Sequence, residues 1–194
     1  MRLFARAIRR SGLDVAYSEG YNPRPRLSLV LPRPVGVASR DDLLVLELRD
    51  HSQPADLCLR LAGHLPNGIS ISTCFDMGSV RAPTAIAAVY SLQLSQDEAA
   101  TAVEKISNVL RAPRLLVHRP PKRSSDNRQL DIRPYLIDIQ LDGTELLSTL
   151  AYTHTGSAKP AELLALLDLD NSYNRAQLVR KEVKYTRCSA TVIA

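Results

Sequence analysis

The residues of this chain best suited to chemistry are arginines that lie beside a proline-rich loop. The first 40 residues hold eight arginines against only Asp14 and Glu19. Residues 17–36, YSEGYNPRPRLSLVLPRPVG, contain four of the twelve prolines. Each proline fixes its own φ angle, which stiffens the loop. Guanidinium groups make planar, bidentate contacts with phosphate or carboxylate. The pattern therefore predicts a stiff surface that presents positive charge to an anionic partner.

A second basic stretch, RPPKRSSDNRQLDIRP, covers residues 119–134. In both stretches the arginines are expected to pair with phosphate or carboxylate. Tyr21 is expected to offer a stacking surface, and Asn22 with its prolines to hold the loop. Each stretch also has a purely structural interpretation that remains open. The arginines of the first helix can simply face solvent, residues 20–26 can form a rigid turn, and residues 119–134 can form a flexible hairpin loop. The candidate binding residues are Arg2, Arg6, Arg9, Arg10, Tyr21, Asn22, Arg24 and Arg26 in the first patch, and Lys122, Arg123 and Arg133 in the second.

Catalytic and metal-binding motifs do not emerge from the sequence. The four histidines are scattered, and none has a second ligand at metal spacing. The three cysteines are also scattered and form no C-x-x-C pair, so we expect buried free thiols. The adjacent carboxylates Asp41 and Asp42 are typical of a solvated turn. No Walker loop, G-x-S-x-G, G-x-G-x-x-G or H-E-x-x-H occurs, and we assign no catalytic residue and no metal site.

Composition places the chain among globular proteins with an aliphatic core. It has 194 residues, of which 45% are hydrophobic and 5% aromatic, and its net charge is +5. No apolar run approaches the ~20 residues of a membrane-spanning helix. The N-terminal sequence MRLFARAIRR lacks the apolar centre and cleavage site of a signal peptide. We therefore expect a cytoplasmic protein with no membrane partner.

The hydrophobic pattern predicts two series of elements that position these residues. The first is a helix over 2–11, strands over 26–31 and 42–49, a helix over 54–66 and a strand over 68–76. The second is a strand over 85–94, a helix over 95–112, a strand over 114–119, a hairpin over 131–155, a helix over 159–169 and a strand over 179–187. For the helix over 95–112, Ser95 and Glu98 have the spacing of a capping box.

These orders predict an α+β fold made of two ferredoxin-like (split β-α-β) units in tandem. The second series reads β-α-β-β-β-α-β, which is such a unit with one added strand. The first reads α-β-β-α-β, which is the same unit without its opening strand. We place the first unit at residues 1–80, with the basic proline-rich loop, and the second at residues 84–194, with a boundary in MGSVRAPT, residues 77–84.

The stretch from Arg6 onward also resembles a known family pattern. That pattern has a helix ending in R-R-x-G-L, then Y-S-x-G-[FY]-N-P-x-P-R, and then L-P-x-G-x-x-S. LPNGISI (65–71) and LDIRPYL (130–136) are similar to two further segments of it. The chain resembles the radical-SAM-linked (radical-SAM-associated) bacterial domain of unknown function, of the DUF2344 type. The matching residues are Arg9, Arg10, Gly12, Leu13, Tyr17, Ser18, Gly20, Tyr21, Asn22, Pro23, Pro25, Arg26, Gly36 and Ser39.

The resemblance implies a companion of a radical-SAM protein with a cobalamin-binding-type domain. The iron–sulfur cluster, SAM and cobalamin are then expected only in that partner, because this chain lacks a C-x-x-x-C-x-x-C cluster site. Arg24 stands where the family often has histidine. Family members also begin one strand and a helix opening earlier, so we expect such a segment to precede Met1.

Three functional hypotheses follow. The first is a non-catalytic module that presents its arginines to RNA or to an anionic substrate. The second is a domain that only docks the radical-SAM enzyme. The third is a nucleotide-modifying enzyme, which would need a carboxylate such as Asp131 buried beside Arg133.

Overall fold

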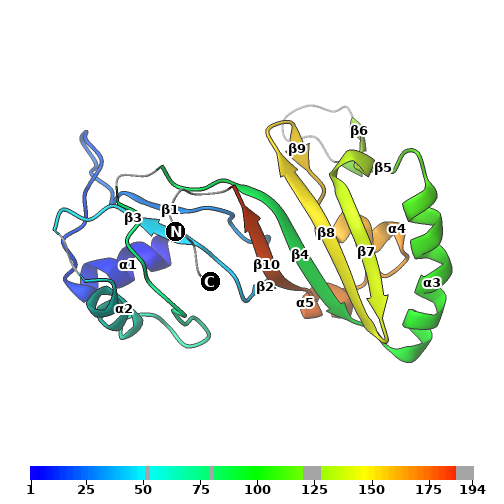
Figure 1. Cartoon of the computed structure of the whole chain (residues 1–194), viewed down its shortest axis with the longest axis horizontal. Coiled ribbons are helices and arrows are strands. Elements are labelled where there is room, and N and C mark those ends of the chain that lie inside the picture. Colours follow the sequence, from blue (N-terminus) through cyan, green and yellow to red (C-terminus); the bar gives the residue numbers. More distant parts are fainter. Residues whose placement is uncertain (51–52, 79–80, 120–127, 187–194) are drawn as a thin grey trace. The chain divides into compact units, whose positions relative to one another are not determined.

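The computed structural model describes residues 1–50, 53–78, 81–119 and 128–186. The fold is a mixture of α-helices and β-strands, as predicted (Figure 1). It divides into two compact units. Unit 1 contains Met1–Leu31 and Leu43–Pro83, and unit 2 contains Pro32–Asp42 and Thr84–Thr186. The chain thus leaves unit 1 after Leu31 and returns to it at Leu43.

Unit 1 is built on two helices and a two-stranded ladder. Its elements are α1 (Arg2–Ser11), β1 (Leu27–Leu29), β3 (Leu44–Leu46) and α2 (Pro54–Ala62). β1 and β3 pair in antiparallel fashion, with Leu27 opposite Leu46. Five buried side chains form its core, with Leu57, Leu65 and Ile71 packed against them: Ala7, Ile8, Leu13, Val15 and Leu61.

The end of α1 is fixed by its glycine and by α2. Gly12 has φ 64°, the left-handed conformation that glycine adopts most readily. From α2, Arg60 Nη2 donates to the carbonyl oxygen of Ser11 at 3.1 Å. One of the carbonyls that a helix end leaves without an internal partner is thereby satisfied. The helix predicted over 2–11 is confirmed.

The strand predicted over 68–76 does not form. Residues 69–76 have no regular secondary structure, and no ladder includes them. The alternation of apolar and polar residues suggested a strand, but a strand needs a neighbour to pair its backbone groups. Ile71 packs on the core while Ser70 and Ser72 are exposed. The contact of Ile71 with the core therefore fixes residues 69–76 without pairing them to a strand.

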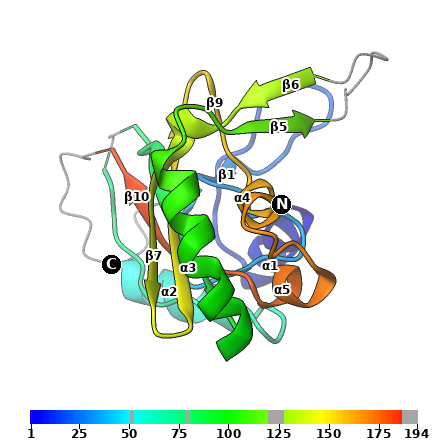
Figure 2. The same ribbon diagram turned by 90° about the vertical axis from the view of Figure 1, so that its right-hand side faces the viewer.

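Unit 2 contains the larger sheet. In chain order its elements are β2 (Ala38–Ser39), β4 (Ala85–Gln93), α3 (Gln96–Arg111), β5 (Leu116–Arg119), β6 (Arg128–Asp131), the 3₁₀ helix η1 (Arg133–Tyr135), β7 (Leu136–Asp142), β8 (Glu145–Thr153), β9 (Gly156–Ser157), α4 (Pro160–Leu166), α5 (Ser172–Gln177) and β10 (Val179–Tyr185). The strand order is β2-β10-β4-β8-β7, with β9 paired to β8. The pairs β10–β4, β4–β8 and β8–β7 are antiparallel, whereas β2 runs parallel to β10. α3 and α4 cover one face of the sheet (Figure 2).

The side chains between this sheet and its helices form the core of unit 2. Tyr90, Leu92 and Leu150 point from the sheet and are at most 1% exposed. Leu163 and Leu167 come from α4 and the residue after it, and are also buried. Burial of each of these four leucines contributes roughly 1.5–3 kcal/mol. The aliphatic core expected from composition is therefore present.

Unit 2 contains elements that were not predicted, among them η1, β9 and α5, and two further details differ from the prediction. Residues 128–131 form a separate strand, β6, that pairs with β5, so the hairpin that follows is β7 and β8 rather than the whole of 131–155. β2, which lies between the strands predicted over 26–31 and 42–49, pairs with β10 far along the chain. A two-residue strand carries no periodic signal, and its pairing becomes visible only in the folded chain.

No helix among the described residues is long and apolar enough to cross a membrane.

Candidate functional site

The exposed side of α1 carries the first group of predicted binding residues. Ala7 and Ile8 are buried, whereas Arg2, Arg6 and Arg9 are exposed. These three arginines follow a spacing of four and three residues, which places them on one side of a helix. Within the described part of the chain, none of their guanidinium groups forms a hydrogen bond or ion pair. We call Arg2, Arg6 and Arg9 the arginine face.

Arg10 has a different role from the arginine face. Its Nη2 donates to the carbonyl oxygen of His64 at 2.9 Å, just beyond the end of α2. The guanidinium group therefore ties α1 to α2 and leaves fewer donors for a ligand. Arg10 remains exposed and adds positive charge beside Arg6 and Arg9.

The loop between α1 and β1 is a closed hairpin held by its own backbone. Tyr17 and Pro25 form an isolated β-bridge. Ser18 N donates to Arg24 O at 2.8 Å, and Arg24 N donates to Ser18 Oγ at 3.0 Å. Ser18 thus supplies the side-chain oxygen that closes the loop, a role the sequence prediction gave to Asn22. We call residues 17–25 the proline loop.

The tip of the proline loop presents the predicted stacking residue. Tyr21 is 99% exposed, and Asn22 and Arg24 are exposed beside it. A fully exposed tyrosine leaves about 1.5–3 kcal/mol of hydrophobic burial unused. The proline loop and α1 both belong to unit 1. Unit 1 therefore exposes Tyr21 and Arg24 to solvent as well as the arginine face.

Arg26 is partly neutralised by an acid. Its Nη1 lies 3.1 Å and 3.2 Å from the two carboxylate oxygens of Glu47. Both side chains are about half exposed, and such surface pairs contribute little to stability, roughly 0–1 kcal/mol. Arg26 belongs to unit 1 but contributes less free positive charge than Arg24.

Arg133, predicted for the second patch, donates to backbone carbonyls. Its guanidinium nitrogens lie 3.2 Å from Leu110 O, 3.2 Å from Ala112 O and 3.1 Å from Leu136 O. The first two carbonyls belong to the end of α3, where a cation also complements the helix dipole. Arg133 therefore fixes the end of α3 against the start of β7. Lys122 and Arg123, the other members of this patch, lie outside the described residues.

Asp131, the carboxylate considered for catalysis, caps backbone groups beside Arg133. Its Oδ1 accepts from Leu115 N at 2.9 Å and from Arg133 N at 3.0 Å. These two backbone hydrogen bonds, from Leu115 first and then Arg133, lower the pKa of Asp131 below its usual value. A carboxylate with a lowered pKa is a weaker base, which is the opposite of what proton abstraction at neutral pH requires. Its geometry is that of a structural cap.

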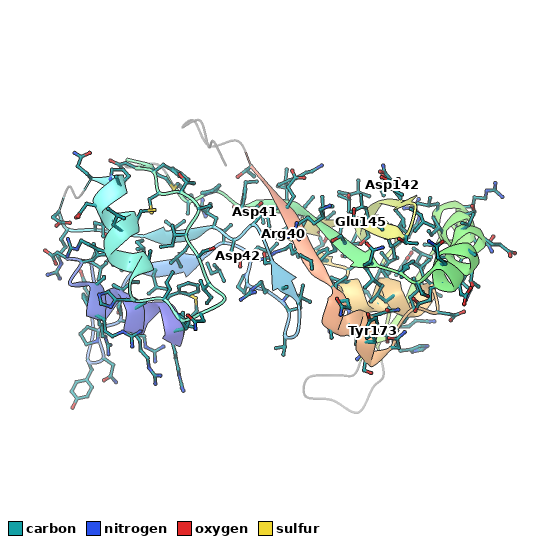
Figure 3. The ribbon with its side chains drawn as sticks, turned by 90° about the horizontal axis from the view of Figure 1, so that it is seen from below. Arg40, Asp41, Asp42, Asp142, Glu145 and Tyr173 are labelled. Atoms are coloured by element: carbon teal, nitrogen blue, oxygen red, sulfur yellow. The ribbon has the colours of Figure 1, made fainter. Side chains whose placement is uncertain are left out.

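Asp41 and Asp42 have partners that the sequence did not reveal. Both follow β2 and are labelled in Figure 3. Asp41 Oδ2 accepts from Val183 N at 2.6 Å. Asp42 Oδ1 accepts from Ser39 Oγ at 3.0 Å and also pairs with Arg180, whose side chain is fully buried. The adjacent acids therefore hold β2 against β10 rather than forming a solvated turn.

The described residues contain no group of three or more histidine, cysteine, aspartate or glutamate side chains placed to hold a metal ion.

Comparison with known families adds one match. A family model described as an uncharacterized protein conserved in bacteria (DUF2344) matches residues 1–160. The chain belongs to the DUF2344 family. The matched region covers the described part of unit 1 and reaches the first residue of α4 in unit 2. All the candidate binding residues of this DUF2344 protein lie inside it. Searches of the curated proteins and of the solved structures found no match to the chain.

Proposed function

We propose that this DUF2344 protein is a non-catalytic binding module whose arginine face and proline loop receive the phosphates and bases of RNA. The observation that carries the proposal is the state of Arg2, Arg6 and Arg9. Their guanidinium groups have no acid or carbonyl partner among the described residues, whereas those of eight other arginines do: Arg10, Arg26, Arg33, Arg60, Arg119, Arg133, Arg175 and Arg180. An unpartnered guanidinium group keeps its full charge and donors for an external phosphate.

Tyr21 supports RNA over a small anion as the ligand. Basic grooves that bind single strands combine backbone phosphate contacts with aromatic rings on which bases stack. The proline loop supplies such a ring at 99% exposure, three positions before the exposed Arg24. Tandem ferredoxin-like sheets with basic loops are also a common RNA-binding architecture, which supports the proposal by analogy.

In this proposal the chain acts beside a radical-SAM protein of the cobalamin-binding type. That partner would carry the iron–sulfur cluster, SAM and cobalamin, and would perform the chemistry. The DUF2344 chain would supply the surface that holds the RNA. This assignment rests on the resemblance of the first motif and on the absence of a cluster-binding cysteine motif in the sequence.

We also propose that both units derive from one ferredoxin-like plan. In unit 2, β4-α3-β7-β8-α4-β10 follows the β-α-β-β-α-β order, and its antiparallel strands lie in the order β10-β4-β8-β7. In unit 1, α1-β1-β3-α2 follows the inner α-β-β-α part of that order. A solved structure in which β10 and β8 do not flank β4 would contradict the plan for unit 2.

A direct binding measurement tests the function. A fluorescent single-stranded RNA is titrated with the wild-type chain and with a triple variant, Arg2→Gln, Arg6→Gln and Arg9→Gln. We expect the triple variant to bind at least tenfold more weakly, because charge-assisted contacts are worth roughly 1.5–3 kcal/mol each. Arg111→Gln, an exposed arginine at the end of α3, is the matched control and should bind as the wild type does.

Two outcomes would speak against the proposal. One is equal RNA affinity of the triple variant and the wild type while both remain folded. The other is capture of the radical-SAM partner that persists after nuclease treatment, together with no RNA binding by the isolated chain. The second outcome would make the chain a protein-docking domain.

A further inference from the structure

Two cysteines that lie 16 positions apart in sequence meet in unit 1. Cys74 Sγ donates to Cys58 Sγ at a distance of 2.8 Å. Cys58 lies on α2, and Cys74 lies in the segment 69–76 that has no regular secondary structure. Both thiols are free and only partly buried. The prediction of free thiols is confirmed for this pair, but the two thiols are partly rather than fully buried, and they are in contact.

The geometry allows a covalent link between these sulfurs. A disulfide holds its sulfurs at about 2.05 Å, so the remaining gap closes with a side-chain adjustment of less than about 1 Å from the 2.8 Å contact. The two elements are already held in place nearby. Leu57 precedes Cys58 on α2, Ile71 lies three residues before Cys74, and both pack on the same core. Both elements that carry the sulfurs are therefore anchored on the core of unit 1 with the sulfurs already in contact.

We propose that Cys58 and Cys74 are a modification site, at which a low-molecular-weight disulfide oxidises the two thiols to an intramolecular disulfide. One thiolate attacks a sulfur of the small disulfide, which forms a mixed disulfide and releases one small thiol. The other cysteine, as its thiolate, then attacks the protein sulfur of the mixed disulfide and releases the second small thiol. The protein loses two hydrogens and two electrons, and the small disulfide is reduced to two thiols.

The environment of Cys74 sets the rate of this exchange. Burial, and then the hydrogen bond to Cys58, raises the pKa of Cys74 to about 12. Its thiolate is scarce at neutral pH, so exchange through Cys74 is slow there and accelerates as the pH rises. A thiolate with a high pKa is also a poor leaving group. The disulfide, once formed, is therefore slow to open when attack at Cys58 must expel Cys74.

A disulfide between Cys58 and Cys74 would raise the stability of unit 1. It would tie the segment 69–76, which no strand pairs, to α2 and hence to the core beneath the arginine face. Cross-linking restricts the unfolded chain, and for a loop of about 15 residues this raises the melting temperature of a small domain by on the order of 10 °C. Oxidation would thus make the unit more resistant to unfolding, and a thiol reductant would reverse the change.

The test uses the full chain with Cys188→Ser, so that only this pair of thiols remains. The protein is incubated with oxidised glutathione at about pH 8.5, where exchange is fast enough to follow. Free thiols are then blocked, and the chain is digested with trypsin without reduction. Arg60 lies between the two cysteines, with Arg49 before and Arg81 after them, so cleavage puts each cysteine in a separate peptide.

We expect peptides 50–60 and 61–81 to be recovered as one cross-linked species, and the melting temperature to rise until dithiothreitol is added. Single variants Cys58→Ser and Cys74→Ser in the same background should take up glutathione without any cross-link or rise in melting temperature. Recovery of the two peptides separately, each blocked or each carrying its own glutathione, would overturn the proposal. So would a cross-linked chain that melts at the temperature of the reduced one.

Discussion

The arginines of this chain divide according to what their guanidinium groups contact. Arg119 makes a bidentate pair with Glu162, at 2.6 Å and 2.7 Å, and also donates to Ser157 O. Arg133 donates to carbonyls at the end of α3, and Arg180 is buried against Asp42. The sequence reveals the number and clustering of arginines, but it does not reveal which of them meet internal acceptors. The arginine face belongs to the arginines whose guanidinium groups meet no internal acceptor among the described residues.

The candidate site was therefore predictable in part. The periodicity of α1 identified its exposed arginines, because Leu3, Phe4, Ala7 and Ile8 define the opposite, apolar stripe. The role of Arg133 was not predictable, because it depends on carbonyls more than twenty positions away in sequence. The pairing of Cys58 with Cys74 was missed for the same reason: their spacing matches no local motif.

Removal of the Tyr21 ring tests the stacking contact. We expect Tyr21→Ala to weaken RNA binding by roughly 1–3 kcal/mol, the usual contribution of one stacked base. The side chain is exposed, so the melting temperature should stay unchanged. Affinity is measured by fluorescence anisotropy. Tyr21→Phe, which keeps the ring, should bind nearly as well as the wild type, and equal affinity of the Ala variant would rule out stacking at this position.

The lowered pKa of Asp131 predicts a pH-dependent effect on stability. A folded-state pKa below the unfolded value, about 3.9, stabilises the fold above that value, and the contribution is lost as the pH falls through the folded-state pKa. Asp131→Asn should therefore melt at a lower temperature than the wild type near neutral pH. The difference should shrink as the pH falls from about 5 to about 2. A difference in melting temperature that stays constant with pH would show that the charge of Asp131 is not involved.

At the scale of elements, strong local patterns were predicted well. The helix expected over 95–112 forms as α3, and Ser95 and Glu98 make the expected capping box, with Glu98 N to Ser95 Oγ at 3.3 Å and Ser95 N to Glu98 Oε2 at 3.0 Å. The short β2 and the unpaired segment 69–76 were not predicted. Their state is decided by neighbours that are distant in sequence, and local propensity does not encode such neighbours.

The link between α3 and β7 provides a prediction at this scale. Arg133→Ala removes the donors that satisfy Leu110 O, Ala112 O and Leu136 O. We expect the free energy of unfolding to fall by roughly 1–3 kcal/mol, as measured by urea denaturation, because carbonyls at a half-buried helix end lose their partner. RNA affinity, measured at urea concentrations too low to unfold the protein, should equal that of the wild type. If Arg133→Ala lowers the RNA affinity and leaves the free energy of unfolding unchanged, Arg133 binds RNA instead of fixing the end of α3.

At the scale of the whole molecule, charge is distributed unevenly along the chain. Residues 1–40 carry most of the excess arginine, and they belong largely to unit 1, whereas unit 2 has the larger sheet and core. The α+β class was accessible from the order of predicted elements. That the segment Pro32–Asp42 belongs to the second unit was not accessible, because it depends on Asp41 and Asp42 meeting β10.

The salt dependence of RNA binding tests the central claim most directly. The affinity of the wild-type chain for a single-stranded RNA is measured over a series of salt concentrations, alongside the triple variant of Arg2, Arg6 and Arg9. If these guanidinium groups bind phosphates, the logarithm of the association constant falls linearly with the logarithm of salt concentration, and the triple variant lowers the slope by roughly 0.7 for each phosphate that it no longer neutralises. A wild-type affinity that does not change with salt, or an identical slope for the two proteins, would contradict the account.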